Sequence, residues 1–168
     1  MTVSMRTPDV TAQRSAMQRL AFLAGDWSGA AQVFRSAEGP VELLQTEHAE
    51  YKLDGLLLLI EGIGRVKSSD GADGRIVLQA LGIVSYDDHA ESYHMRAYND
   101  GRYLETEIKL SADRNELTWG FAAGEIRTSS RLWLNERGRW TELHEVTVGA
   151  QPTRKLMEVS VSRTKPSA

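Results

Sequence analysis

The sequence predicts an all-β fold, a closed antiparallel meander β-barrel of about ten strands with one N-terminal helix at the base. A short amphipathic helix runs into Gly25-Asp26-Trp27, and the hydrophobic period after it changes from helical spacing to two. Turn signals then recur at the spacing typical of all-β proteins. About ten strands in meander order favour a closed barrel, because closure removes exposed sheet edges.

The predicted helix comes first in the chain. We expect Thr7 to cap its N-terminus and Pro8 to take the first helical position. Gly25 is expected to end it. The apolar residues at helical spacing are Ala12, Ala16, Met17, Leu20 and Leu23.

Ten strands are expected after the helix, near residues 27–35, 40–53, 56–67, 75–86, 91–99, 102–110, 115–122, 125–135, 139–149 and 154–163. They make one barrel domain over 25–164, after a tail and helix over 1–24 and before a tail over 165–168. The chain has 168 residues, of which 41% are hydrophobic and 26% are charged, and this suits one globular core.

Turn residues predict the register of the early hairpins. Asp100-Gly101 is a type I′ turn signal, so Asn99 pairs with Arg102. Asp54-Gly55 is a turn signal of the same kind, and the register that it predicts places Glu47 in the barrel interior. These registers leave most charged residues on the outer face, as in a sheet with one wet side.

The later hairpins decide which way the polar residues of the C-terminal half face. A turn at Ala123-Gly124 predicts that Phe121 lies opposite Ile126. A three-residue loop ending at Gly138 aligns Ser130 with His144 and turns both inward. A two-residue loop would instead expose His144, because one slip reverses every side chain.

The predicted lumen is apolar and aromatic with a few polar groups, which is the composition of a small-molecule pocket. A ten-stranded barrel also has room for a ligand. The alternative is a packed core with a few satisfied polar residues. The residues expected to contact a ligand are Glu47, Tyr51, Tyr93, Met95, Trp119, Thr128, Ser130, His144 and Met157.

Glu142 and His144 are the candidate catalytic residues. They lie two residues apart on one predicted strand face. A buried histidine beside a carboxylate can transfer protons, and Tyr51 or Tyr93 would assist. The alternative is a hydrogen-bonded core histidine, because buried polar groups need partners whatever the function.

Composition argues against several other functions. The net charge is −3 and no Lys/Arg cluster is visible, so we expect no nucleic-acid partner. The chain has no cysteine, and its four histidines lack metal-ligand spacing, so we expect no metal and no cofactor. The longest apolar run, 56–60, is too short to span a bilayer, and the N-terminus lacks the apolar stretch of a secretory signal. We therefore expect a cytoplasmic protein with no membrane partner.

The helix before Gly25-x-Trp27, the meander and the basic Arg163 in the last strand together resemble the calycin superfamily of lipocalins, fatty-acid-binding proteins and haem-binding nitrobindins. The resemblance implies that Gly25, Trp27 and Arg163 plug the base of the barrel, with the arginine over the indole. The segments SYDDHAESYHMRAYNDGRYLETE and GEIRTSSRLWLNERGRWTELHEV are similar to a bacterial family of uncharacterised lipocalin-like proteins, which implies a fold and no established activity.

The chain also departs from these relatives. Ten strands fit fatty-acid-binding proteins and nitrobindins more than eight-stranded lipocalins. Haem ligation of the nitrobindin type needs a histidine near the C-terminus; the last strand has none, and His144 is one strand earlier. Fatty-acid carriers bind the carboxylate with inward arginines, whereas the predicted register turns Arg127 and Arg131 outward.

Three functions follow as hypotheses. The first is a binding protein that holds a small apolar or aromatic molecule inside the barrel. The second is a cofactor-free enzyme of isomerase or cyclase type that uses His144 and Glu142. The third is a structural homodimer without a ligand, in which Leu57 and Leu59 form the contact between subunits.

Overall fold

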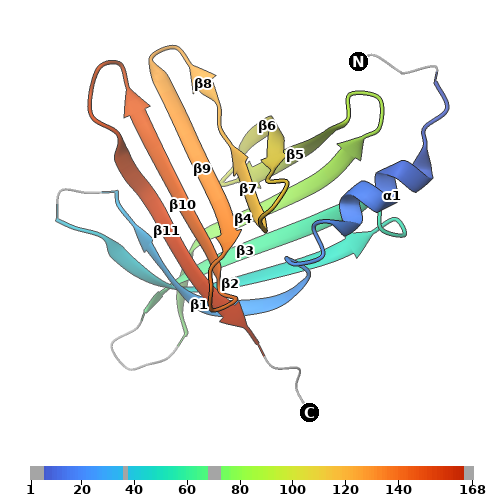
Figure 1. Ribbon diagram of the computed structural model, residues 1–168. Helices are drawn as coiled ribbons and strands as arrows, with labels where there is room; N and C mark the ends of the chain where they lie inside the picture. Colours follow the sequence, from blue (N-terminus) through green and yellow to red (C-terminus); the bar gives the residue numbers. More distant parts are fainter. Residues whose placement is uncertain (1–5, 36–37, 68–72, 165–168) are drawn as a thin grey trace.

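The computed structural model describes residues 6–35, 38–67 and 73–164, which form a closed ten-stranded antiparallel β-barrel with a short N-terminal helix (Figure 1). The predicted tail over 165–168 lies outside the described residues. The elements are α1 (Val10–Gln18), β1 (Gly25–Val33), β2 (Val41–Lys52), β3 (Leu57–Lys67), β4 (Asp73–Asp87), β5 (Ser92–Asn99), β6 (Arg102–Leu110), β7 (Glu116–Trp119), β8 (Ala122–Ala123), β9 (Ile126–Leu134), β10 (Trp140–Val148) and β11 (Arg154–Arg163).

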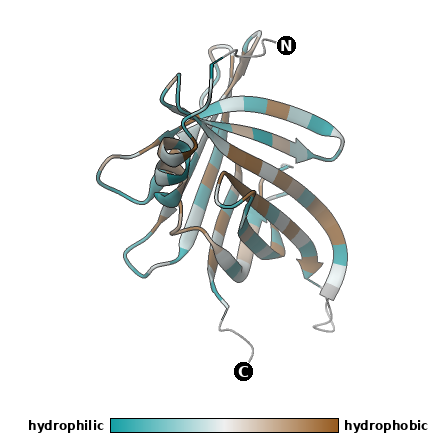
Figure 2. Ribbon diagram, turned by 90° about the vertical axis from the view of Figure 1, so that its right-hand side faces the viewer, coloured by the Kyte–Doolittle hydropathy of each residue, from teal (hydrophilic) through white to brown (hydrophobic). Residues whose placement is uncertain are grey.

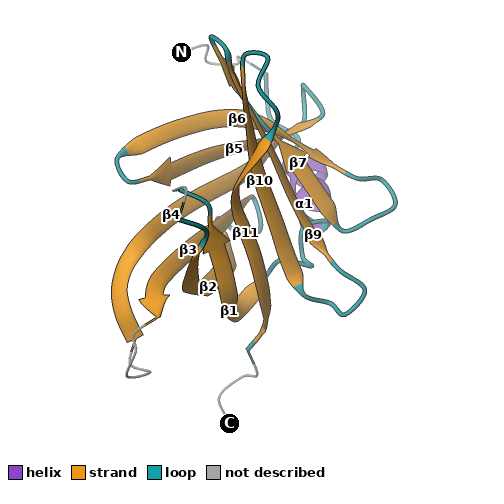
Figure 3. Cartoon of the chain, turned by 90° about the vertical axis from the view of Figure 1, so that its left-hand side faces the viewer, coloured by secondary structure: helices purple, strands orange, loops and turns teal. Residues whose placement is uncertain are grey.

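The barrel is a meander in which neighbouring strands follow one another along the chain. The exception is β8, a two-residue strand that extends the pairing of β7 with β9 and adds no separate position around the barrel. The first and last strands pair to close the sheet, with Trp27 opposite Arg163 (Figure 3). The predicted fold class is therefore confirmed.

The helix differs from its prediction at both ends. It begins at Val10, and the Asp9 side chain caps it by accepting a hydrogen bond from the backbone N–H of Ala12 at 2.9 Å. The expected cap at Thr7 is wrong because Asp9, an equally good capping residue, lies one position before the first helical turn. The regular helix ends at Gln18, and single turns carry the chain to Gly25, which begins β1 with φ +121°.

Most of the predicted registers are confirmed. Asn99 lies opposite Arg102, and Ser130 lies opposite His144. The register predicted for the turn at 123–124 is wrong by two residues, because Ala123, not Phe121, lies opposite Ile126. Gly124 and Glu125 form the turn, with Gly124 at φ +60°. A shift of two residues leaves every side chain on its expected face.

The barrel has one closed end and one open end. Helix α1 and the turns at 53–56, 88–91, 111–115 and 135–139 lie at the closed end. The last residues of β1, β3, β5, β8 and β10 and the first residues of β2, β4, β6, β9 and β11 lie at the other end, which we call the mouth. Hydrophobic and hydrophilic residues alternate along the strands between the two ends (Figure 2). In the described part of the chain, the helix is too short to cross a membrane.

Candidate functional site

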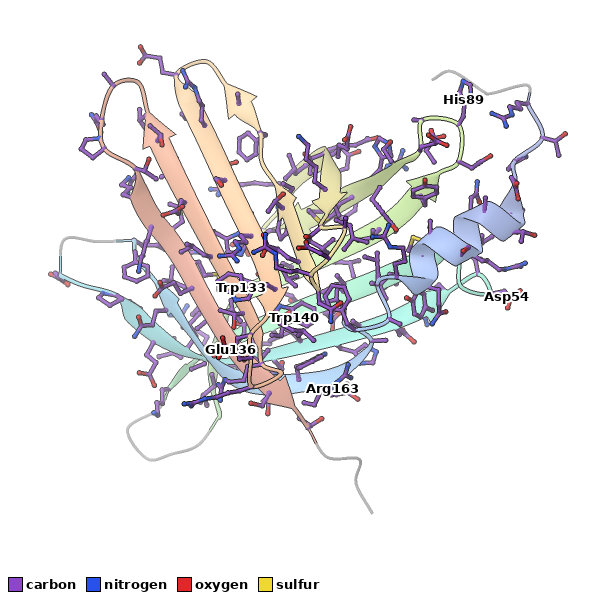
Figure 4. The ribbon with its side chains drawn as sticks, in the orientation of Figure 1. Asp54, His89, Trp133, Glu136, Trp140 and Arg163 are labelled. Atoms are coloured by element: carbon purple, nitrogen blue, oxygen red, sulfur yellow. The ribbon has the colours of Figure 1, made fainter. Side chains whose placement is uncertain are left out.

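Two tryptophans form the floor of the barrel at its closed end. Trp27 donates from Nε1 to the Leu23 carbonyl at 2.9 Å, and its ring meets Trp140 edge-on with centroids 5.5 Å apart. The Arg163 guanidinium lies 4.2 Å from the centre of the Trp27 ring. Figure 4 shows Trp140 and Arg163 at this end of the sheet. Arg163 also donates to the carbonyls of residues 22 and 24, which ties the last strand to the segment after the helix.

Gly25 makes room for this arrangement. A Cβ at Gly25 would lie 2.7 Å from Nη1 of Arg163, and the φ of +121° disfavours any other residue there. Trp140 was not among the residues that sequence reasoning placed in the lumen. The register predicted for the last turn pairs Trp140 with Leu134, and this pairing could have shown that Trp140 faces inward.

Tyr51 and Tyr93 attach the helix to the barrel. The Tyr51 hydroxyl donates to the Met17 carbonyl and the Tyr93 hydroxyl to the Ala16 carbonyl, each at 2.7 Å. Burial, with a smaller contribution from Tyr93, raises the pKa of Tyr51 to about 12. Both phenols are therefore neutral donors at the closed end, away from the mouth.

Ser130, Glu142 and His144 form a continuous hydrogen-bonded chain on the inward faces of β9 and β10. His144 Nε2 lies 2.8 Å from Glu142 Oε2, and His144 Nδ1 lies 2.8 Å from Ser130 Oγ. If Glu142 is ionised, His144 Nε2–H donates to it, and Nδ1 of a neutral imidazole then accepts from the Ser130 hydroxyl. The second Glu142 oxygen accepts from Trp140 Nε1 at 2.6 Å. The imidazole is thus held between a carboxylate and a hydroxyl.

Glu47 faces the same interior from β2. Its residue surface is 7% exposed, and Gln45 Nε2 donates to its Oε1 at 2.7 Å. Burial and the nearby Glu142 carboxylate raise the pKa of Glu47 well above 4.5. Gly62 on β3 leaves the space that this carboxyl fills, since a Cβ there would lie 2.8 Å from Oε2. The interior therefore holds two neighbouring carboxyls, of which Glu47 has its pKa raised by burial and by Glu142.

Gln45 is a second interior polar residue, and sequence reasoning missed it. It is 1% exposed, and its Oε1 has no hydrogen-bond partner in the described residues. It lies two positions from Glu47 on the same face of β2, so the strand period alone could have identified it.

Thr128, which we expected in the lumen, and Thr106 on β6 hold an irregular stretch of backbone. Thr106 Oγ1 donates to the Gly120 carbonyl at 3.0 Å, and Thr128 Oγ1 accepts from the Phe121 N–H at 3.1 Å. Phe121, between β7 and β8, has 43% of its surface exposed. These hydroxyls are therefore engaged in joining β7 to β8.

Some inward side chains are partly accessible midway along β10 and on β11. On β10, Trp140 is 0% exposed, whereas the side chains of Glu142 and His144 are 13% and 23% exposed. On β11, the buried Val159 is followed toward the mouth by the half-buried Met157, which lies opposite His144. Val146, nearer the mouth on β10, is 6% exposed, so the accessible inward side chains form a patch around Glu142, His144 and Met157.

Five residues surround this accessible region, and we call them the lumen site: Trp119, Ser130, Glu142, His144 and Met157. The Trp119 ring meets His144 edge-on, with centroids 5.8 Å apart. The other residues expected to contact a ligand are not in this group. Glu47 is buried on β2 near the Glu142 carboxyl, Met95 is buried on β5, and Tyr51 and Tyr93 contact the helix.

Two hollows lie outside the lumen. One, of about 820 Å³, is bordered by Arg114, Arg131 and Trp133, with the Arg131 guanidinium 4.2 Å from the Trp133 ring centre. The other, of about 460 Å³, lies on the outer face of β1, β10 and β11. Arg131 binds Glu116 at 2.7 Å, so its charge is compensated.

The remaining histidines lie on the surface. His48 bonds Asp26 at 2.6 Å, His94 bonds Ser92 at 2.9 Å, and His89 bonds Arg6 at 2.8 Å. Within residues 6–35, 38–67 and 73–164, no three metal-ligating side chains come together. Figure 4 shows His89 near α1.

Comparison with known proteins identifies a similar fold. The crystal structure of Rv2717c from M. tuberculosis matches this chain with a TM-score of 0.66 and 14% sequence identity, covering 89% of this chain and 98% of that one. At that identity the likeness concerns the fold alone. No family model matches the sequence, and no curated protein matches it.

Proposed function

We propose that this protein is a calycin-like barrel that binds a small apolar or aromatic molecule at the lumen site. The observation that carries the proposal is a patch of partly accessible inward side chains, Glu142, His144 and Met157, which on β10 lies between the buried Trp140 and the buried Val146. Close-packed cores leave little space beside inward side chains, so partly accessible ones support room for a guest.

The chemistry of the lumen site favours that class of ligand. Trp119 and Met157 offer an aromatic edge and a polarizable thioether, both suited to a flat apolar group. His144 and Ser130 supply polar atoms at one side only. An apolar lining with few polar groups gives affinity from burial and orientation from hydrogen bonds.

The test is native mass spectrometry of freshly purified protein, followed by titration with the dye 1-anilinonaphthalene-8-sulfonate. We expect a bound small molecule, or dye fluorescence that rises on addition to ligand-free protein. Met157→Trp should abolish both by filling the lumen. Leu143→Trp, on the outer face of β10, is the matched control and should retain both. The proposal would be refuted if wild-type protein shows no bound small molecule in the mass spectrum and does not increase the fluorescence of the dye.

A second candidate function is proton transfer within the bound molecule, as in an isomerase or cyclase. The observation that favours it is the Ser130–His144–Glu142 chain, in which a carboxylate orients an imidazole whose other nitrogen faces a hydroxyl. Ser130 takes the assisting position that we had expected for Tyr51 or Tyr93.

The two candidates differ in what His144→Phe does. Phenylalanine keeps the ring size but removes both nitrogens. A binder should retain the same molecule, with affinity lower by the ~0.5–1.5 kcal/mol of one neutral hydrogen bond. An enzyme should slow by about 10²–10⁴ and retain the unreacted isomer. Chromatography of the extracted molecule from both proteins distinguishes these outcomes, because isomers share a mass but not a retention time.

A further inference from the structure

Two carboxyl groups lie next to the tryptophan floor on the inside of the barrel. Glu142 on β10 accepts from Trp140 Nε1 at 2.6 Å, and Glu47 on β2 lies opposite Trp27 on β1. The two tryptophan rings are in contact, so the residues that flank them are neighbours. The charge of Glu142 also contributes to the raised pKa of Glu47. Two acids therefore face one region of the interior.

Glycines on both sides of β2 leave space for the polar side chains of this region. Gln45 lies between Gly29 and Gly64 on the neighbouring strands, and Glu47 lies beside Gly62. A Cβ at Gly62 would lie 2.8 Å from Glu47 Oε2, and a Cβ at Gly64 would lie 2.9 Å from Gln45 Oε1. The glycines therefore admit the polar ends of both side chains, where larger residues would exclude them.

Hydrogen-bond acceptors in this region lack donors. Gln45 Nε2 donates to Glu47 Oε1 at 2.7 Å, but no described residue donates to Glu47 Oε2. Gln45 is 1% exposed, and its Oε1 also has no partner in the described part of the chain. Buried acceptors without donors are unfavourable, so each one needs an explanation.

Positive charge is also scarce beside the two acids. Glu142 bonds His144 at 2.8 Å. Across residues 6–35, 38–67 and 73–164, no lysine or arginine forms an ion pair with Glu142 or Glu47. Neighbouring carboxyls disfavour each other's ionisation, and a cation between them removes this conflict.

We propose that the molecule bound at the lumen site carries a protonated amine, which lies between Glu47 and Glu142 with Oε1 of Gln45 as a further acceptor. The inference rests on the proposed function and names its ligand class, an apolar or aromatic amine. A primary ammonium brings one positive charge and three N–H donors, which suits a region with two acids and unpartnered acceptors. The apolar part of the ligand would lie against Trp119 and Met157.

The same region disfavours an acidic ligand. A carboxylate placed there would add a third acid and no donor, and like charges in a buried site repel one another. Discrimination between an amine and an acid of the same shape would therefore come from the protein's own carboxyls.

The experiment is isothermal titration calorimetry of the ligand-free full chain with three indoles of similar shape. Tryptamine is cationic, 3-propylindole is neutral and indole-3-propionic acid is anionic. We expect tryptamine to bind about tenfold or more tightly than 3-propylindole, since hydrogen bonds to charged groups contribute at least that factor. Indole-3-propionic acid should bind most weakly of the three.

Variants assign the preference to the two carboxyls. Glu47→Gln should lower the affinity for tryptamine about tenfold or more and leave the affinity for 3-propylindole unchanged. Glu142→Gln is a second variant with the same expected effect. Glu145→Gln removes an equal charge from the outer face of β10, so it is the matched control and should bind both indoles like wild type. Circular dichroism of each variant checks that the barrel is intact.

Three results would overturn the inference. If wild type binds tryptamine and 3-propylindole equally, the ligand class is wrong, although the proposed function stands. The same holds if Glu47→Gln and Glu145→Gln lose equal affinity for tryptamine. If none of the three indoles binds, the inference also fails, and the dye titration described above then decides the proposed function independently.

Discussion

Glu47 shows how the fold changes the chemistry of one side chain. The carboxyl is buried in the barrel wall beside the Glu142 carboxylate, and both influences raise its pKa well above 4.5. An acid whose pKa is raised by folding binds more protons in the folded state than in the unfolded state. Its contribution to stability is fully present below about pH 4.5 and is lost as the pH rises through the folded-state pKa.

Glu47→Gln should therefore change the pH dependence of stability. Glutamine keeps the shape and cannot ionise, so the variant should gain stability relative to wild type as the pH rises above 4.5. Urea denaturation of both proteins at pH 4.5 and pH 8 measures this difference. Other titrating groups are common to both proteins and cancel. If the difference in unfolding free energy between the two proteins does not vary with pH, folding does not raise the pKa of Glu47.

At the scale of elements, helix α1 is held to the barrel by two phenols. The Tyr51 and Tyr93 hydroxyls donate to consecutive helix carbonyls, those of Met17 and Ala16. Arg14 adds an ion pair with Asp54 beside the helix. The helix itself is nine residues long, which is too short to be stable alone in water, so these contacts and the burial of Met17 hold it in place.

Tyr51→Phe/Tyr93→Phe should loosen the helix without opening the barrel. Each change removes one hydrogen bond to a carbonyl and costs about 0.5–1.5 kcal/mol. Hydrogen exchange should accelerate in residues 10–18 and stay unchanged in β9 and β10. Tyr98→Phe, at the mouth, is the matched control and should leave helix exchange unaffected. Equal acceleration in the strands would mean that the phenols support the whole barrel.

The hairpins were the elements that the sequence predicted most closely, because a two-residue turn such as Asp100-Gly101 sets the register of both strands. The turn near Gly124 was misplaced, since one glycine can occupy either position of a short loop. The pairing of Ser130 with His144 was predictable from such turns. The hydroxyl contacts of Tyr51 and Tyr93 were not, because the position of a helix over a barrel end depends on tertiary packing that leaves no period in the sequence.

At the scale of the whole molecule, the floor of the barrel joins its two halves. Trp27 from β1 packs against Trp140 from β10, and Arg163 from β11 covers it. Trp27→Ala should destabilise the protein by about 3–5 kcal/mol, as truncation of a buried tryptophan does. Trp133→Ala, on the outer face of β9, should cost much less. Urea denaturation measures both, and equal losses would contradict a special place for Trp27.

Coupling between the floor residues can be measured separately. Arg163→Met removes the cation above the indole, a contact worth on the order of 1 kcal/mol. In a double-mutant cycle, Arg163→Met should cost less in the Trp27→Ala background than in wild type. Strict additivity would mean that Arg163 acts only through its bonds to the carbonyls of residues 22 and 24.

The pairing of β1 with β11 has a consequence for the newly made chain. During synthesis, β1 to β10 leave the ribosome before the strand that completes the ring, so β1 and β10 each present an unpaired edge. Contacts between distant parts of a chain also form slowly, because loop closure must precede them. The nascent protein thus passes through a stage in which an open, curved sheet can capture strands from other chains. Translation speed through the last hairpin would set how long that exposure lasts.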